Sequence, residues 1–303
     1  MTAPPRLFDR DLHRLRLNRA ARGFAQVGFL KWAAAEDLAA RLAAVNRSFA
    51  IAVDLGARDG AFARALADGE AAGKVGFLAQ ADLSAAMLSG RPGARLVADE
   101  ERLPFRQASV DLIVSALALH WTNDLVGALI QIRRALKPDG LFLGSLLGGS
   151  TLTELRQALL EAEIDVTGGA GPRVSPFADA GDMGGLLQRA GFALPVVDVD
   201  RLTVRYHHPL ALIADLRAMG ETSVLVERPT APLTSTILAR AGEIYIRRFS
   251  SGGRIGATFE IVTLTGWAPH PAQPKPLKPG SATTRLADAL GQVEQRAGDR
   301  AAS

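Results

Sequence analysis

The stretch FAIAVDLGARDG, residues 49–60, decides the fold. Its first seven residues are nearly all apolar, as in a strand that is buried on both faces of a sheet. Glycines stand at positions 56 and 60, and a helical pattern follows over 61–68. Glycine permits a sharp turn and lets the backbone approach a ligand closely. The stretch therefore predicts the first strand–loop–helix unit of a parallel sheet, with a ligand site at the strand end.

The same alternation of strand and helix continues along the chain, which is typical of an α/β fold. Further strands are predicted over 74–81, 94–98, 110–116, 141–147, 196–204 and 258–267. Helices are predicted over 124–136, 151–164, 182–190, 209–219 and 233–248, with a turn at 137–140. The helix from Thr151 is predicted to begin with a capping box that includes Glu154. We expect a Rossmann-like, seven-stranded sheet whose insertions at about 150–190 and 209–248 form a helical cap over an acceptor pocket.

The flanking segments have their own composition. Residues 1–47 are predicted to form a basic helical lid, 48–267 the α/β domain, and 268–303 a proline-rich tail with a surface helix over 284–296. Phe8, Leu12, Leu15 and Arg19 have helical spacing, which also fits an amphipathic helix that packs one face on the domain. In the lid interpretation, arginines such as Arg10 lie near the cofactor or an acidic partner. The two interpretations are compatible.

Composition and charge exclude several classes of function. The 303 residues include no cysteine, which excludes disulfides, zinc–thiolate sites and cysteine nucleophiles and fits a reducing compartment. No apolar run is long enough for a signal peptide or a transmembrane segment. The net charge is +4, but residues 1–31 alone carry +5. Because the remainder is nearly neutral, we expect no nucleic-acid partner and a cytoplasmic location, with peripheral association at the inner face of the membrane left open.

Acidic residues follow the predicted strand ends. Asp82 ends the second strand, where an acid accepts hydrogen bonds from ribose hydroxyls, and Asp99 ends the third, where an acid accepts from an adenine amine. Each acid alone is also a candidate helix cap. Together with the glycine turn, in order on successive strand ends, they favour nucleoside binding. The spacing of Gly56 and Gly60 does not match the dinucleotide pattern, which disfavours a nicotinamide cofactor.

A resemblance to a known family extends these inferences. The segments that carry it are LFDRDLHRLRLNRAA (7–21), ADEERLPF (98–105), SALALHWTNDLVGALIQIRRALKPDGLFLGSLLGGSTLTELRQAL (115–159), SPF (175–177), GGLLQRAGF (184–192), MGETS (219–223) and GSAT (280–283). With them the chain resembles the arginine-hydroxylase type of mitochondrial respiratory complex I assembly factor and its bacterial relatives. A more distant likeness is to the malonyl-carrier-protein O-methyltransferase of biotin synthesis.

The resemblance implies a class I methyltransferase fold that binds S-adenosylmethionine, with S-adenosylhomocysteine as the product of methyl transfer. It also implies a protein acceptor, a respiratory complex I subunit, of which an arginine is hydroxylated. The cofactor-binding residues that we expect are Asp54, Gly56, Arg58, Gly60, Asp82, Leu83, Asp99, Glu100 and Ser115. An O-methyltransferase for a carrier-bound or small carboxylic acid, and a non-catalytic assembly chaperone with the same fold, remain alternatives.

One cofactor-loop residue departs from the family pattern, since Arg58 stands where a glycine is usual. Its cation either obstructs the methionine moiety or reaches the methionine carboxylate. We favour the second, because a guanidinium suits a carboxylate.

The candidate catalytic residues are His120, Trp121 and Glu221. The first two follow the fourth strand, where they either orient an acceptor and cover a cationic arginine or serve in packing. Glu221 either pairs with an incoming arginine or forms a surface ion pair. A large, partly apolar groove is predicted between the two cap segments, with His120 and Trp121 at its floor. With no His-x-Asp motif, no metal site is predicted. The segment 115–118 lacks the Asp/Asn-Pro-Pro-aromatic sequence of enzymes that methylate nucleobases.

Overall fold

The computed structural model describes residues 6–229, 231–273, 288 and 291. The predicted tail and surface helix therefore lie almost entirely outside the described residues. Within the described part, residues 6–269 belong to one compact unit. No helix there is long and apolar enough to cross a membrane.

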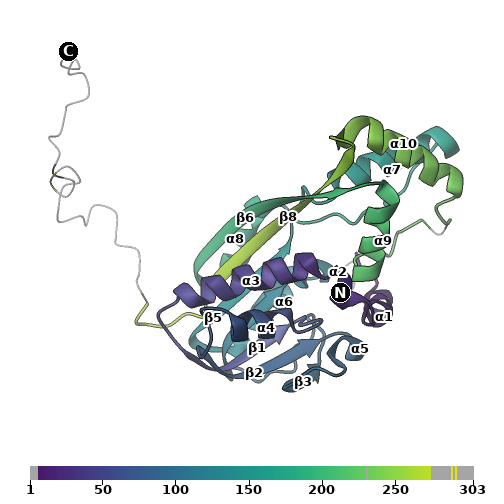
Figure 1. Ribbon diagram of the computed structural model, residues 1–303. Helices are drawn as coiled ribbons and strands as arrows, with labels where there is room; N and C mark the ends of the chain where they lie inside the picture. Colours follow the sequence, from purple (N-terminus) through teal and green to yellow (C-terminus); the bar gives the residue numbers. More distant parts are fainter. Residues whose placement is uncertain (1–5, 230, 274–287, 289–290, 292–303) are drawn as a thin grey trace, which may run out of the picture. The chain divides into compact units, whose positions relative to one another are not determined.

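A mixed sheet forms the centre of this unit (Figure 1). Its strands are β1 (Phe49–Leu55), β2 (Val75–Asp82), β3 (Ala94–Val97), β4 (Val110–Ala116), β5 (Leu136–Leu147), β6 (Ala193–Tyr206), β7 (Ser250–Ser251) and β8 (Arg254–Trp267). Their order is β3-β2-β1-β4-β5-β8-β6, with the two-residue β7 paired to β8. The strands from β3 to β5 run parallel, whereas β8 is antiparallel to both of its neighbours. The predicted α/β fold is confirmed.

Helices cover both faces of the sheet and extend beyond one end of it (Figure 1). They are α1 (Arg10–Ala20), α2 (Phe24–Val27), α3 (Phe29–Ala44), α4 (Ala61–Asp68), α5 (Ala85–Leu88), α6 (Leu125–Ala135), α7 (Thr153–Thr167), α8 (Ala180–Arg189), α9 (Pro209–Met219) and α10 (Ser235–Phe249), with a 3-10 turn at Leu119–Trp121. Polar caps begin several of them. Asp9 accepts from the Leu12 amide, and Asp124 from the Gly127 amide.

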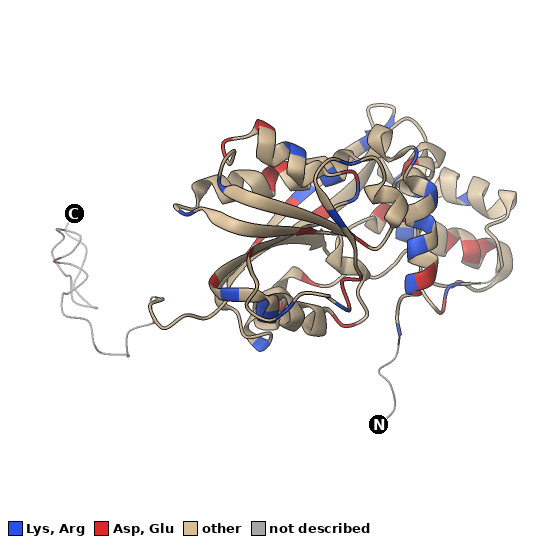
Figure 2. Ribbon diagram, turned by 90° about the horizontal axis from the view of Figure 1, so that it is seen from below, with Lys and Arg blue, Asp and Glu red and all other residues tan. Residues whose placement is uncertain are grey.

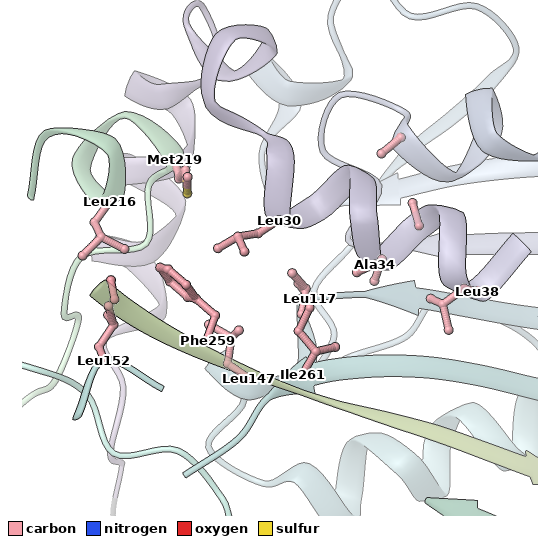
Figure 3. Packing of buried hydrophobic residues seen from close by; sticks show 14 of the residues in the cluster. Leu30, Ala34, Leu38, Leu117, Leu147, Leu152, Leu216, Met219, Phe259 and Ile261 are labelled. Carbon is pink, nitrogen blue, oxygen red and sulfur yellow. The ribbon is translucent and has the colours of Figure 1, made fainter. Parts of the chain in front are cut away.

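The larger hydrophobic core joins the sheet to the N-terminal helices and the cap (Figure 3). Leu30 and Leu38 of α3 face Leu117 and Leu147, which lie near the ends of β4 and β5. A second core cluster lies around α6 and α8. Segments of positive and negative charge are mixed through the described fold (Figure 2).

The N-terminal segment is fastened beside the loop that follows α9. The Phe8 amide donates to the side chain of Asn123 over 2.7 Å, and the Asp9 amide donates to the Val224 carbonyl over 2.8 Å. An isolated bridge pairs Phe8 with Leu225. These contacts hold α1 across the carboxyl end of β4.

Two local predictions were wrong. The helix α7 begins at Thr153, not at Thr151, and its N-cap is Leu152. The Thr151 hydroxyl instead bonds to the backbone of Glu260, and the Glu154 carboxylate accepts from Thr258. Both side chains of the expected capping box therefore fasten the helix to β8. In addition, the predicted turn over 137–140 lies within β5, although Asp139 keeps a positive φ of 62°.

Candidate functional site

The loop after β1 is built around two glycines that no other residue can replace without strain. Gly56 and Gly60 have φ values of +74° and +75°. A Cβ at Gly56 would lie 2.3 Å from the Cβ of Ala118, and one at Gly60 would lie 2.8 Å from Oε1 of Gln80. The amides of Gly56 and Ala57 both donate to the Ala81 carbonyl, at 2.8 and 2.9 Å. The loop is thereby held against the end of β2, next to Asp82.

Arg58 pairs with Asp82 inside this loop. Its backbone amide and its Nη1 each donate to Oδ2 of Asp82 over 2.9 Å, while the Ser84 amide donates to Oδ1 over 2.8 Å. Burial acts against the Arg58 charge, but the Asp82 and Glu100 carboxylates raise the pKa of Arg58 above its ordinary value. The guanidinium thus binds the acid that we expect to hold the ribose. It also keeps a left-handed backbone, with a φ of +51°.

A second arginine neutralises the acids after β3. Nη2 of Arg10 on α1 contacts Oδ1 of Asp99 at 2.7 Å and also binds the buried carboxylate of Glu100. Its Nη1 donates to the Trp121 carbonyl over 3.1 Å. Leu83 is buried in a small cluster with residues of α1. The helix α1 therefore covers this part of the crevice, and its arginine meets acidic residues of the same chain.

Asp54 and Lys31 lie side by side beneath the loop, and both are buried. Nζ of Lys31 donates to the carbonyls of Gly56 and Ala116. Burial lowers the pKa of Lys31 to about 8, although Asp54 opposes that shift. Burial also raises the pKa of Asp54 to about 6, against the attraction of Lys31. The charges of both groups are held at a cost.

Several buried polar atoms of this crevice have no hydrogen-bond partner among the described residues. They are both carboxylate oxygens of Asp54, Nη2 of Arg58, Oε1 of Glu100, Oγ of Ser115 and Nδ1 of His120. Unsatisfied buried groups are costly and rare in folded proteins, and they gather where a polar ligand supplies the missing bonds. Together with the glycine cradle, this donor and acceptor set fits a nucleoside carrying an amino acid moiety.

His120, Trp121 and Glu221 form one contiguous group. Nε2 of His120 lies 3.2 Å from Oε2 of Glu221, and the Trp121 indole donates to the same oxygen over 2.8 Å. Burial alone raises the pKa of Glu221, but the bonds from His120 and Trp121 and the charge of Arg58 bring it below its ordinary value. Glu221 is therefore an anion held at a fixed position, rather than a surface ion pair.

A cavity of about 30 Å³ separates this group from the loop and α3. Its polar walls are Lys31, Arg58, His120 and Glu221, and its apolar walls include Leu117, Leu147 and Met219. The predicted large groove with His120 and Trp121 at its floor was wrong. Trp121 is buried beneath the N-terminal segment, where its ring packs against Phe8 and His13. A larger groove lies instead along α7, outside this cavity.

The sequence analysis did not identify His13 and Lys31 as site residues. The ring of His13 is buried 5.1 Å from that of Trp121. Burial, together with the charges of Arg58 and Arg10, holds the pKa of His13 well below its usual range, so the ring is neutral. Lys31 had a signal, because it stands on the otherwise apolar face of α3 with Leu30, Ala34 and Ala35. Within the described ranges, no three His, Asp or Glu side chains are placed to hold a metal ion.

Comparisons with known proteins agree with this geometry. A family model described as a methyltransferase domain matches residues 53–144. Arginine-hydroxylase NDUFAF5 of Mus musculus is 40% identical over 286 residues, which cover 93% of this chain and 83% of that protein. The human form is 40% identical over 294 residues and covers 95% and 84%. A malonyl-[acyl-carrier protein] O-methyltransferase of Methylovorus is 32% identical, with 89% and 93% covered.

A solved structure shares the fold at low sequence identity. It is a candidate methyltransferase from Bacillus halodurans with a TM-score of 0.52 and 14% identity, covering 78% of this chain and 99% of that one. Fold, loop and relatives together define an enzyme of the class I S-adenosylmethionine-dependent methyltransferase superfamily, with S-adenosylmethionine as its cofactor. Within that superfamily, the chain belongs to the family of the arginine-hydroxylase NDUFAF5.

Proposed function

We propose that this enzyme hydroxylates an arginine side chain of a protein acceptor. The single observation that carries the proposal is the fixed carboxylate of Glu221, which His120 and Trp121 hold beside the cavity at the cofactor crevice. A carboxylate oriented by two donors is suited to bind one edge of a guanidinium. The names of the relatives that are 40% identical over most of the chain agree with an arginine acceptor.

The cofactor site is assigned to the loop and the acids around it. Asp82 would bind the ribose hydroxyls, and Asp99 and Glu100 with Leu83 would surround the adenine. Asp54 would pair with the methionine ammonium, because its two unpartnered oxygens face the crevice beneath the glycine loop. S-adenosylmethionine supplies an electrophilic methyl group when bound. Arg58 and Arg10 must give up part of their contacts with Asp82 and Asp99 to make room.

A neighbouring observation supports O-methylation of a carboxylic acid as the second candidate. The same cavity presents the cations of Lys31 and Arg58, which would attract a carboxylate acceptor. The O-methyltransferase relative is 32% identical over 89% of the chain. The two reactions differ in product, since hydroxylation adds one oxygen atom and methylation adds one methylene.

We assign the partner and the location on the same footing. The resemblance favours a respiratory complex I subunit as the acceptor, with an encounter in the cytoplasm or at the inner face of the membrane. The domain arrangement proposed here is a lid over 1–47 on the α/β domain of 48–267.

Intact-protein and peptide mass spectrometry of complex I subunits, in cells with and without the gene, tests this function. We expect one arginine-containing peptide to lose the mass of one oxygen atom when the gene is deleted, and to regain it with the wild-type gene but not with Glu221→Gln. An unchanged subunit set, with a carrier-bound acid that loses its methyl ester instead, would establish the second candidate.

A further inference from the structure

A groove of about 550 Å³ runs between α7 and the segment 170–177. Its walls include Leu159, Leu160, Val174 and Pro176, and Leu160 is 49% exposed. The volume is in the range of ligand sites, but the walls are mainly apolar and open. A surface of this kind marks a site of interaction when it is contiguous.

The groove continues toward the N-terminal segment. A second hollow of about 340 Å³ shares Pro172 and Pro176 with it and reaches Leu7 and Leu225. Leu7 is exposed, as is Val226 beside it in the chain. A depression extended in this way matches a stretch of polypeptide better than a compact small molecule.

Arg156 gives the groove its polar requirement. Its guanidinium donates to the carbonyls of Thr151 and Ser175, at 3.4 and 3.2 Å, and no carboxylate lies within ion-pair distance among the described residues. Burial lowers the pKa of Arg156, and no acidic neighbour opposes the shift. Arg173, in the same wall, is already paired with Glu163. A partly buried cation without an anion favours a partner that brings a carboxylate.

The groove leads to the candidate catalytic group through Phe177. Its ring lines the groove and also packs at 5.8 Å, edge to face, against the ring of His120. A chain that lies in the groove therefore passes next to the only side chain between it and the His120–Glu221 pair that both sides share in these contacts.

We propose that the α7 groove binds an extended segment of the protein acceptor that flanks the modified residue. Apolar side chains of this segment pack on Leu159, Leu160 and Val174, and an acidic side chain pairs with Arg156. The proposal rests on a protein being the acceptor, and it specifies what the sequence around the target residue must contain.

Fluorescence anisotropy of the full chain with labelled peptides tests the proposal. The probe is a twelve-residue peptide with one central arginine, flanked by alternating leucine and aspartate. Its partner peptide carries asparagine at each aspartate. We expect the acidic peptide to bind wild type at least tenfold more tightly than the amide peptide, and Arg156→Gln to remove that difference. Arg156→Lys keeps the charge and should retain part of it.

Matched variants separate the groove from the rest of the surface. Leu160→Glu should weaken binding of the acidic peptide tenfold or more, whereas Leu210→Glu, at a leucine on α9 that is 51% exposed, should leave it unchanged. Arg106→Gln, on an exposed loop, is the control for Arg156→Gln. Thermal unfolding of each variant shows whether it is folded.

Each result decides the matter. Absence of binding by folded wild type, equal binding of the two peptides, or binding that Arg156→Gln and Leu160→Glu leave intact overturns the proposal. Wild-type dimers that Leu160→Glu dissociates, with no peptide bound, would assign the groove to a second copy instead. Because binding needs no turnover, a peptide that binds but gains no oxygen contradicts the proposed function and leaves the groove assignment standing.

Discussion

Arg58 and Asp82 form an ion pair in which both side chains are buried, at 1% and 0% exposure, and 2.9 Å separates Nη1 from Oδ2. A nucleoside that binds to Asp82 therefore competes with an internal cation. The pair also explains why the chain tolerates an arginine in a loop that favours glycine, since the carboxylate compensates for its buried charge.

Replacing Arg58 by glycine should strengthen cofactor binding. The variant removes the competitor for Asp82 and suits the left-handed backbone at this position. A charge-assisted hydrogen bond contributes about 1.5–3 kcal/mol, so we expect roughly tenfold tighter binding of S-adenosylmethionine by calorimetry. The unliganded variant should unfold at lower temperature, because Asp82 loses its partner. Weaker binding would show that Arg58 contacts the cofactor itself, as the sequence suggested.

Asp54 should make the stability of the unliganded protein depend on pH. Its pKa rises from 3.8 to about 6 on folding, so the folded protein retains a proton that the unfolded chain releases. Stability from this group is present below about pH 4 and is lost as the pH rises to about 6, by about 3 kcal/mol. Asp54→Asn removes that loss.

The measurement is denaturant unfolding of wild type and Asp54→Asn across this pH window. We expect the variant to be the more stable protein at neutral pH and nearly equal to wild type at acidic pH, while it binds the cofactor more weakly. Asp68→Asn on the surface of α4 is the control. A variant that is less stable than wild type at neutral pH would contradict the assignment.

Glu221→Gln should separate acceptor chemistry from cofactor binding. The amide keeps the size of the side chain and a contact with the Trp121 indole but loses the charge. We expect turnover of the acceptor to fall roughly a hundredfold, which corresponds to about 2.7 kcal/mol, with cofactor affinity changed less than threefold. Glu70→Gln, at an exposed position, should behave as wild type. Full activity of Glu221→Gln would remove this residue from the site.

Most of the fold was predictable because local periodicity and tertiary structure agree. The apolar run at 49–55 and the glycines at 56 and 60 predicted β1 and its loop within a residue. The capping box at Thr151 failed for a tertiary reason, since both of its side chains bind β8, more than a hundred residues away. Local hydrogen-bonding patterns do not report such competitors.

The site was predictable only in part. Acids at strand ends were found because the topology brings strand ends together. The partners of those acids were not, because Arg10 and Lys31 reach them from helices far away in the sequence. The neutral His13 has no local signal at all. Arg58 was identified from the sequence, but its partner Asp82 required the folded loop.

The central claim is that the crevice of Asp54, Gly60 and Asp82 binds S-adenosylmethionine. Titration calorimetry of the full chain with S-adenosylmethionine and S-adenosylhomocysteine tests it most directly. We predict saturable binding at one site, weakened by about 1–3 kcal/mol in Arg58→Gly/Asp82→Asn relative to Arg58→Gly alone, because ribose hydroxyls lose a charged acceptor. Folded protein that gives no binding heat at millimolar ligand, or a double variant that binds as tightly as Arg58→Gly, would contradict the claim.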